Sequence, residues 1–74
     1  NELQRAVGNV LEQLTEKQRT ALVMIDLQGL TYEEAAEVLD CPLGTLKSRL
    51  VRARQAFAEE FREHQSQWIP NGTA

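Results

Sequence analysis

The sequence predicts an all-α fold, a four-helix domain that contains a C-terminal helix-turn-helix. Apolar residues recur at helical spacing through most of the 74-residue chain. Two start signals, each a threonine followed three residues later by glutamine or glutamate, mark helix beginnings at Thr15 and Thr31. No alternating run of apolar and polar residues bounded by turns indicates a strand. A chain of this length buries only ~60% of its unfolded surface, so it forms one small domain at most.

The first predicted helix covers residues 2 to 13. The second begins after Thr15, where Gln18 completes a capping box, and continues to about Gln28, after which Gly29 suits a helix C-terminus. Its broad apolar stripe predicts contacts on more than one side. The first helix and the residue that follows it place a set of apolar side chains on one face, namely Leu3, Val7, Val10, Leu11 and Leu14.

A short third helix is expected over residues 32 to 39, after the capping box that begins at Thr31. Pro42 suits the first turn of a fourth helix, which places Cys41 at its N-cap and continues to about Arg62. A short helix, a tight connection and a longer helix indicate a helix-turn-helix. A plain helical hairpin within a bundle is the alternative.

These boundaries predict a domain over residues 1–63 and a loosely ordered tail over residues 64–74, which contains proline and glycine and has no clear period. Trp68 and Ile69 form a small apolar pair in the tail. We expect one of three roles for this pair: packing back on the domain, contact with another region of the parent protein, or an ordinary linker. Because the chain opens at Asn1 rather than at methionine, we expect it to be part of a longer protein.

The fourth helix is predicted to have one apolar and one polar face. At 100° per residue its inward stripe consists of Leu46, Leu50, Ala53, Phe57 and Phe61. The opposite face carries Ser48, Val51, Arg52 and Gln55. Lys47 and Arg54 lie on one flank of the stripe and Arg49 lies on the other. The outward surface is therefore expected to be polar and basic, with one exposed valine.

Charge is distributed unevenly along the chain. The formal net charge is -3, yet residues 41 to 58 contain four basic residues and no acidic one, which leaves -7 on the remainder. A basic helix beside an acidic one can present positive charge to phosphates. With few basic residues in all and a pI near 5.0, the isolated domain is expected to bind DNA weakly and to need a larger partner.

The residue types on the outward face suit base reading. Lysine and arginine donate to guanine, Gln55 can pair with adenine, and Ser48 can reach a base edge or a phosphate. Val51 fits a thymine methyl group, although a harmless exposed valine is the alternative. Arg49 and Arg54 on the flanks are expected to hold phosphates. For Arg54, a salt bridge to an acid elsewhere in the fold is the alternative.

Other functional classes find little support. The sequence has no catalytic grouping, metal-ligand spacing or glycine-rich phosphate loop, so we expect no enzyme, no cofactor and no small-molecule substrate. Cys41 and His64 are the only residues of their types, which excludes a disulfide within the chain and a Cys/His zinc site. No apolar run approaches the ~20 residues that span a bilayer, and no signal peptide is visible, so we expect a cytoplasmic protein without membrane contact.

The segment LTEKQRTALVMIDLQGLTYEEAAEVLDCPLGTLKSRLVRARQAF closely resembles region 4 of the extracytoplasmic-function sigma factors of the sigma-70 superfamily. The resemblance covers roughly residues 3 to 62. Its most specific parts are the Gly-Thr-Leu-Lys-Ser-Arg run and the Arg-Ala-Arg triplet. It implies that the fourth helix recognises the -35 promoter element in the major groove of double-stranded DNA. It also implies docking on the β-subunit flap of RNA polymerase and, in many members, sequestration by an anti-sigma factor.

Carried onto this sequence, the resemblance implies roles for individual residues of the last two helices. The base-facing positions are Lys47, Ser48, Val51 and Arg52. Phosphate contacts or supports are Thr45, Arg49 and Arg54. Tyr32 and Glu33 match positions near the DNA backbone. The promoter-melting region expected upstream is absent, so we expect this chain to be part of a sigma factor rather than a complete one.

Two further classes stay open. A LuxR-type response-regulator output domain has a similar supporting helix and a similar opening of the recognition helix. It usually continues with a separate dimerisation helix, whereas the fourth helix here is expected to be unbroken, and the Arg52-Ala53-Arg54 triplet fits the sigma pattern better. The other class is a helical protein-interaction module that does not bind DNA.

Overall fold

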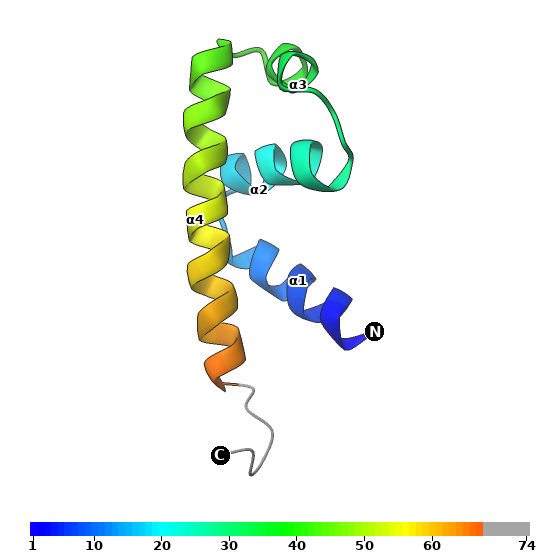
Figure 1. Ribbon diagram of the computed structural model, residues 1–74, viewed down its shortest axis with the longest axis vertical. Coiled ribbons are helices and arrows are strands. Elements are labelled where there is room, and N and C mark those ends of the chain that lie inside the picture. The colour runs from blue at the N-terminus through cyan, green and yellow to red at the C-terminus, as the bar shows by residue number, and fades with distance from the viewer. Residues whose placement is uncertain (68–74) are drawn as a thin grey trace.

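The computed structural model describes residues 1–67, which form an all-helical domain measuring 48 × 21 × 15 Å. The predicted all-α, four-helix fold is confirmed, and no strand occurs among these residues. Figure 1 shows the three shorter helices along one side of the long fourth helix: α1 beside its C-terminal half, α2 across its middle and α3 near its start. The elements in chain order are α1 (Glu2–Gln13), α2 (Glu16–Leu22), a π-helical turn η1 (Val23–Leu27), α3 (Tyr32–Leu39) and α4 (Leu43–Gln67).

Both predicted capping boxes are present and fix where α2 and α3 begin. The Thr15 hydroxyl accepts from the Gln18 amide at 3.1 Å, and the Gln18 side chain accepts from the Thr15 amide at 3.3 Å. At Thr31 and Glu34 the two corresponding distances are 3.0 and 2.8 Å. Each box satisfies two backbone N–H groups that the first turn of a helix leaves without partners. The starts of both helices are therefore set by local sequence.

The second helix ends near the predicted residue, but its last turn is wider than expected. Over η1 the backbone bonds skip one residue more than in an α-helix, as in the 2.8 Å bond from the Gln28 amide to the Val23 carbonyl. Gly29 follows with φ of 77°, a left-handed conformation that glycine adopts without steric cost. The Leu30 amide then donates to the Met24 carbonyl at 2.9 Å and closes the helix end.

The turn between α3 and α4 is held by its own backbone. Asp40 adopts φ 53° and ψ 52°, the left-handed conformation that commonly ends a helix. Its amide donates to the Glu37 carbonyl at 3.1 Å, and the next amide, that of Cys41, donates to the Ala36 carbonyl at 3.0 Å. This pair of bonds is the Schellman arrangement, which reverses the chain within two residues. The tight connection predicted for the helix-turn-helix is confirmed.

The start of α4 corrects one prediction. Pro42, not Cys41, precedes the first helical residue, because the Pro42 carbonyl accepts the first helical bond from the Leu46 amide at 3.1 Å. A proline there loses nothing, since it has no N–H to leave unpaired at a helix start.

The end of α4 also differs from the prediction made for it. The helix continues to Gln67 rather than to about Arg62, so residues 64–67 are helical and do not belong to a loose tail. No proline or glycine occurs between Gly44 and Pro70, and Phe61 and His64 are half-buried beside α1. The predicted apolar pair Trp68 and Ile69 lies outside the described residues.

The predicted inward face of α4 is confirmed as the centre of the core. Leu46, Leu50 and Ala53 are at most 1% exposed. Phe57 and Phe61 are half-buried and stack with their ring centroids 5.9 Å apart. Two buried clusters meet along this face: Leu14, Leu22, Leu50 and Ala53 in one, and Ala21, Ala35, Ala36 and Leu46 in the other. Every other α-helix therefore packs on α4.

The position of Leu50 in the core predicts a large loss on truncation. Leu50→Ala is expected to lower the free energy of unfolding by ~2–5 kcal/mol, because the removed atoms leave a cavity that the neighbours fill only in part. Chemical denaturation followed by circular dichroism measures it. Val51→Ala is the matched control: Val51 is 54% exposed, and a surface change of this kind stays within about 0.5 kcal/mol. Equal stabilities for the two variants would show that the inward face is misassigned.

Candidate nucleic-acid interface

Small residues of α3 pack against the start of α4, on the side opposite its exposed face. Ala35 and Ala36 are buried in the same cluster as Leu46. Alanines leave little side-chain volume between two helices, so their axes can approach closely. The packing fixes α3 against the first turns of α4 and leaves the opposite face of α4 uncovered. This is the arrangement in which a helix-turn-helix presents its second helix to a duplex.

The structure brings the predicted base-facing residues together on that uncovered face. All of them come from the first half of α4, and none is buried. Val51, the apolar member, is 54% exposed. Arg49 is half-buried on one flank of the face. The exposed residues of the set are Thr45, Lys47, Ser48, Val51, Arg52 and Gln55.

A shallow hollow of ≈ 640 Å³ lies beside this face. It lies between the start of α2 and the start of α4, and no acidic side chain lines it. Lys17 and Gln18 of α2 contribute to it, although no pattern in the sequence indicates that either residue lies beside α4. The α4 residues that line it include Thr45, Ser48, Arg49 and Arg52.

Arg54 has an intramolecular partner, as the alternative reading of the sequence had it. Its Nε donates to Asp26 Oδ2 at 3.0 Å and its Nη2 donates to Asp26 Oδ1 at 2.6 Å. The pair is bidentate, which matches the planar fork of a guanidinium to a carboxylate. It joins η1 to α4 across 28 residues of sequence. The predicted phosphate contact of Arg54 stays a prediction. In this structure the Arg54 side chain links α4 to η1.

The ion pair changes the pKa of both groups. The hydrogen bonds from Arg54 hold the pKa of Asp26 below its ordinary 3.8, against the smaller opposing effect of partial burial. The Asp26 carboxylate in turn raises the pKa of Arg54, with a lesser contribution from the nearby Tyr32 hydroxyl. Both groups are charged throughout the physiological range.

Tyr32 and Glu33 differ in burial although they are neighbours at the start of α3. Tyr32 is half-buried and packs against both core clusters, so its ring is a structural contact. Glu33 is exposed. Their proposed positions near the DNA backbone stay predictions.

Two kinds of site are not found within the described part of the chain. Residues 1–67 contain no group of three or more His, Cys, Asp or Glu side chains that could hold a metal ion. Over the same range, none of the helices combines the length and the apolar character that crossing a membrane requires.

A tight helix-turn-helix, in which the first half of the second helix presents a cationic and acid-free face to the outside, defines the class: a helix-turn-helix DNA-binding domain. The sequence profile described as "Sigma-70, region 4" matches residues 4–57. The chain therefore belongs to the sigma-70 region 4 family, which is a non-enzymatic domain of sigma factors. This match decides against the LuxR-type alternative.

The curated proteins that the chain resembles are described as sigma factors. The chain is 46% identical over 61 residues to the "ECF RNA polymerase sigma-E factor" of Haemophilus influenzae, covering 82% of this chain and 32% of that protein. It is 47% identical over 56 residues to the proteins of the same description from Salmonella typhimurium and Escherichia coli strain K12, covering 76% of this chain and 29% of each of them. The chain thus spans about a third of the length of these curated relatives.

The Asp26–Arg54 pair predicts a pH-dependent contribution to stability. Because the pKa of Asp26 is lowered on folding, the contribution is complete above the ordinary value of 3.8 and is lost as the pH falls through the lowered pKa. The side chains are 37% and 46% exposed, so Asp26→Asn is expected to cost only ~0.2–1 kcal/mol at neutral pH.

Urea unfolding of the wild type and of Asp26→Asn at neutral pH and in strong acid measures this effect, and the difference between them should vanish in acid. Glu59→Gln removes the same charge from an exposed position that has no ion-pair partner among the described residues. A difference that persists in acid, or an equal cost for Glu59→Gln, would contradict the assignment.

Proposed function

We propose that this chain is the part of an extracytoplasmic-function sigma factor that binds the -35 promoter element and so directs transcription initiation. One observation carries the proposal: the outward face of the first half of α4, up to Ala58, is exposed, basic and free of acidic residues, although the chain as a whole has a net charge of -3. In the region 4 family this face belongs to the recognition helix. The major groove of B-DNA is wide enough to admit an α-helix.

The charge distribution supports an oriented approach to DNA. The exposed acids Glu33, Glu34 and Glu37 lie on α3, and the exposed cations Lys47 and Arg52 lie on α4. A dipolar domain of this kind turns its basic helix toward a phosphate backbone and keeps the acidic helix away from it. The interaction falls off with added salt, because the fixed charges are screened.

Within the groove, the proposed roles follow the chemistry of each side chain. Arg52 and Lys47 donate to the O6 and N7 atoms of guanine, and Gln55 suits adenine. Val51 meets a thymine methyl group, which explains why an apolar side chain stands exposed among polar ones. Ser48 donates to a base edge or to a phosphate. Thr45 and Arg49 line the hollow between α2 and α4 beside this surface. They contact phosphates and so fix the position of α4 along the DNA.

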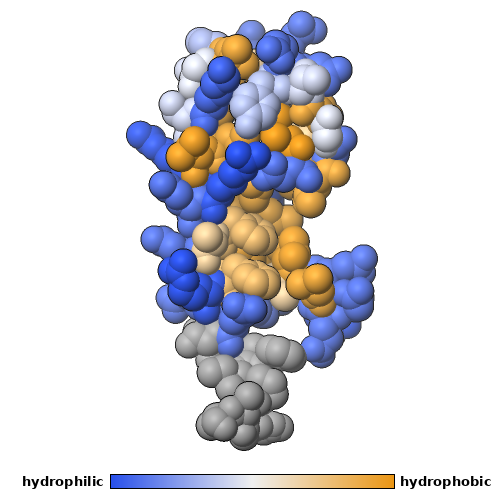
Figure 2. All heavy atoms as spheres, viewed as in Figure 1, coloured by the Kyte–Doolittle hydropathy of each residue, from blue (hydrophilic) through white to orange (hydrophobic). Residues whose placement is uncertain are grey.

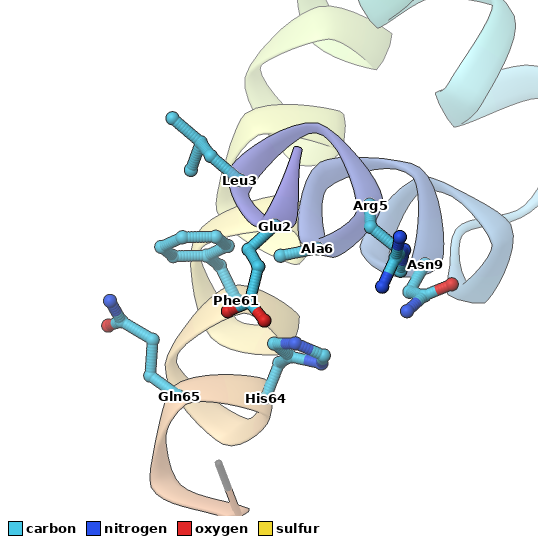
Figure 3. A pocket seen from close by; sticks show the side chains of 8 residues that line it. All are labelled: Glu2, Leu3, Arg5, Ala6, Asn9, Phe61, His64 and Gln65. Carbon is cyan, nitrogen blue, oxygen red and sulfur yellow. The ribbon is translucent and has the colours of Figure 1, made fainter. Parts of the chain in front are cut away.

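A second surface is proposed to meet RNA polymerase. Figure 2 shows apolar side chains exposed where α4 meets α1 and α2, bordered by hydrophilic residues. Leu3 and Leu27 are 64% and 62% exposed there. We call this surface the apolar seam. It contains two apolar hollows of ≈ 420 and ≈ 280 Å³, the first lined in part by Phe61 and the second by Phe57. In Figure 3 Phe61 points from α4 toward the first turn of α1, with Leu3 beside it.

Exposed apolar surface rimmed by polar residues is typical of a protein-binding site. The base-facing residues Lys47, Ser48, Val51 and Arg52 line neither apolar hollow, so the two proposed surfaces use different residues of α4. We propose the β-subunit flap of the polymerase core as the partner of the apolar seam, and an anti-sigma factor as a competitor for it. Docking on the polymerase, in the cytoplasm, supplies binding energy that a domain with so few cations lacks.

The apolar seam also favours a second candidate, a protein-interaction module that does not bind DNA. Simultaneous replacement of Lys47, Ser48 and Arg52 by alanine separates the two functions. All three residues are exposed, so the variant is expected to fold normally. The DNA-binding function requires loss of promoter activity in the parent protein, whereas an interaction module would keep its activity.

The central test is selection. The chain, placed in a complete sigma factor and assembled with core polymerase, is used to enrich promoters from a pool randomised around the -35 position. The expected result is one short enriched motif. A pool that stays random, although the same holoenzyme initiates transcription, would overturn the proposed function.

For a single residue, Arg52→Ala is expected to weaken binding to the selected promoter by ~1–3 kcal/mol and to relax the preference at one base pair. Competition binding against a panel of single-base variants measures both effects. Arg62→Ala is the control, since Arg62 is an exposed arginine farther along α4. An equal loss on every sequence would mean that Arg52 contacts only phosphate.

A further inference from the structure

The two ends of the second helix emerge on opposite flanks of the recognition helix. On one flank, Lys17 and Gln18 at the start of α2 share a hollow with Arg49 and Arg52 of α4. On the other, η1 continues α2 and brings Asp26 to Arg54. Helix α2 therefore crosses α4 so that its start and its η1 continuation contact different flanks of the recognition helix.

This crossing makes the two flanks electrically different. Asp26 neutralises the Arg54 flank through two hydrogen bonds. On the other flank, Lys17, Arg49 and Arg52 have no ion-pair partner among residues 1–67, and the hollow between them has no acidic lining. An unneutralised cationic flank beside a recognition helix is the side that a phosphate strand is drawn to.

Lys17 itself stands where helix stability disfavours a cation. It is the second residue of α2, near the positive end of the helix dipole, where an acidic side chain is favoured by about 0.3–1 kcal/mol. It is exposed and has no partner within the described part of the chain that would compensate. The side-chain oxygen of the adjacent Gln18 accepts the capping-box bond from the Thr15 amide. This bond fixes the orientation of the Gln18 side-chain amide and leaves its N–H donors available.

We propose that Lys17, supported by the Gln18 amide, forms a second phosphate-binding arm next to Arg49. The ligand is the sugar–phosphate backbone of one strand of the duplex whose bases α4 reads. Lys17 then fixes the position of α4 in the groove and carries no base specificity, as phosphate contacts generally do. This inference rests on the proposed function.

The test is the salt dependence of binding by Lys17→Gln. Loss of one phosphate contact reduces the slope of log K against log salt by ~0.9. The reduction is expected to be the same on the selected -35 duplex and on a scrambled duplex, measured by fluorescence anisotropy with the chain in its holoenzyme. Lys17→Arg keeps the charge and is expected to keep the wild-type slope. The melting temperature of Lys17→Gln is expected to stay the same or rise, because an unfavourable dipole interaction is removed.

Arg62→Gln removes the same charge from α4 outside the hollow and is expected to leave the slope unchanged. A wild-type slope for Lys17→Gln, in an experiment where Arg52→Ala still weakens binding, would overturn the proposed phosphate contact of Lys17 and leave the proposed function standing. A similar slope loss for Arg62→Gln would also overturn it, since the effect would then be one of overall charge. Absence of any DNA binding by the wild-type holoenzyme would overturn both.

Discussion

The burial of one stripe of α4 is the interaction on which the rest of the structure depends. Leu46, Leu50 and Ala53 are almost completely removed from water, and each of the other α-helices packs on this helix. Because the stripe fixes the rotation of α4 about its own axis, it also determines which residues face outward. The recognition face is thus a consequence of the hydrophobic core, and Arg52 is exposed for the same reason that Leu50 is buried.

The same rotation divides the domain into surfaces of different chemistry. Polar and basic residues occupy the side of α4 that the core leaves free, while Phe57 and Phe61 are directed toward α1. With α4 extending over 25 residues, the proposed DNA surface lies on its first half and the apolar seam lies mainly along its second half.

Features coded by neighbouring residues could be predicted from the sequence. The capping boxes at Thr15 and Thr31 and the inward stripe of α4 depend on residues within one or two turns, and all are confirmed. What was missed depends on residues far apart in the chain. The Asp26–Arg54 pair joins positions 28 apart and could only be left as an alternative, and the place of Lys17 beside α4 follows from how α2 crosses it. The extra length of α4 depends on contacts with α1, which periodicity does not report.

The π-helical turn η1 makes the end of the second helix tolerant of changes in chain length. Each of its hydrogen-bonded loops encloses one residue more than in the α-helix it continues, and Gly29 follows in a left-handed conformation. Removal of a single residue there would be absorbed by a return to regular α-helical spacing. The helix-turn-helix downstream would keep its place, whereas Asp26 would rotate away from Arg54. Insertion or deletion of one codon in this segment would then add or remove the salt bridge without changing the sequence of α4.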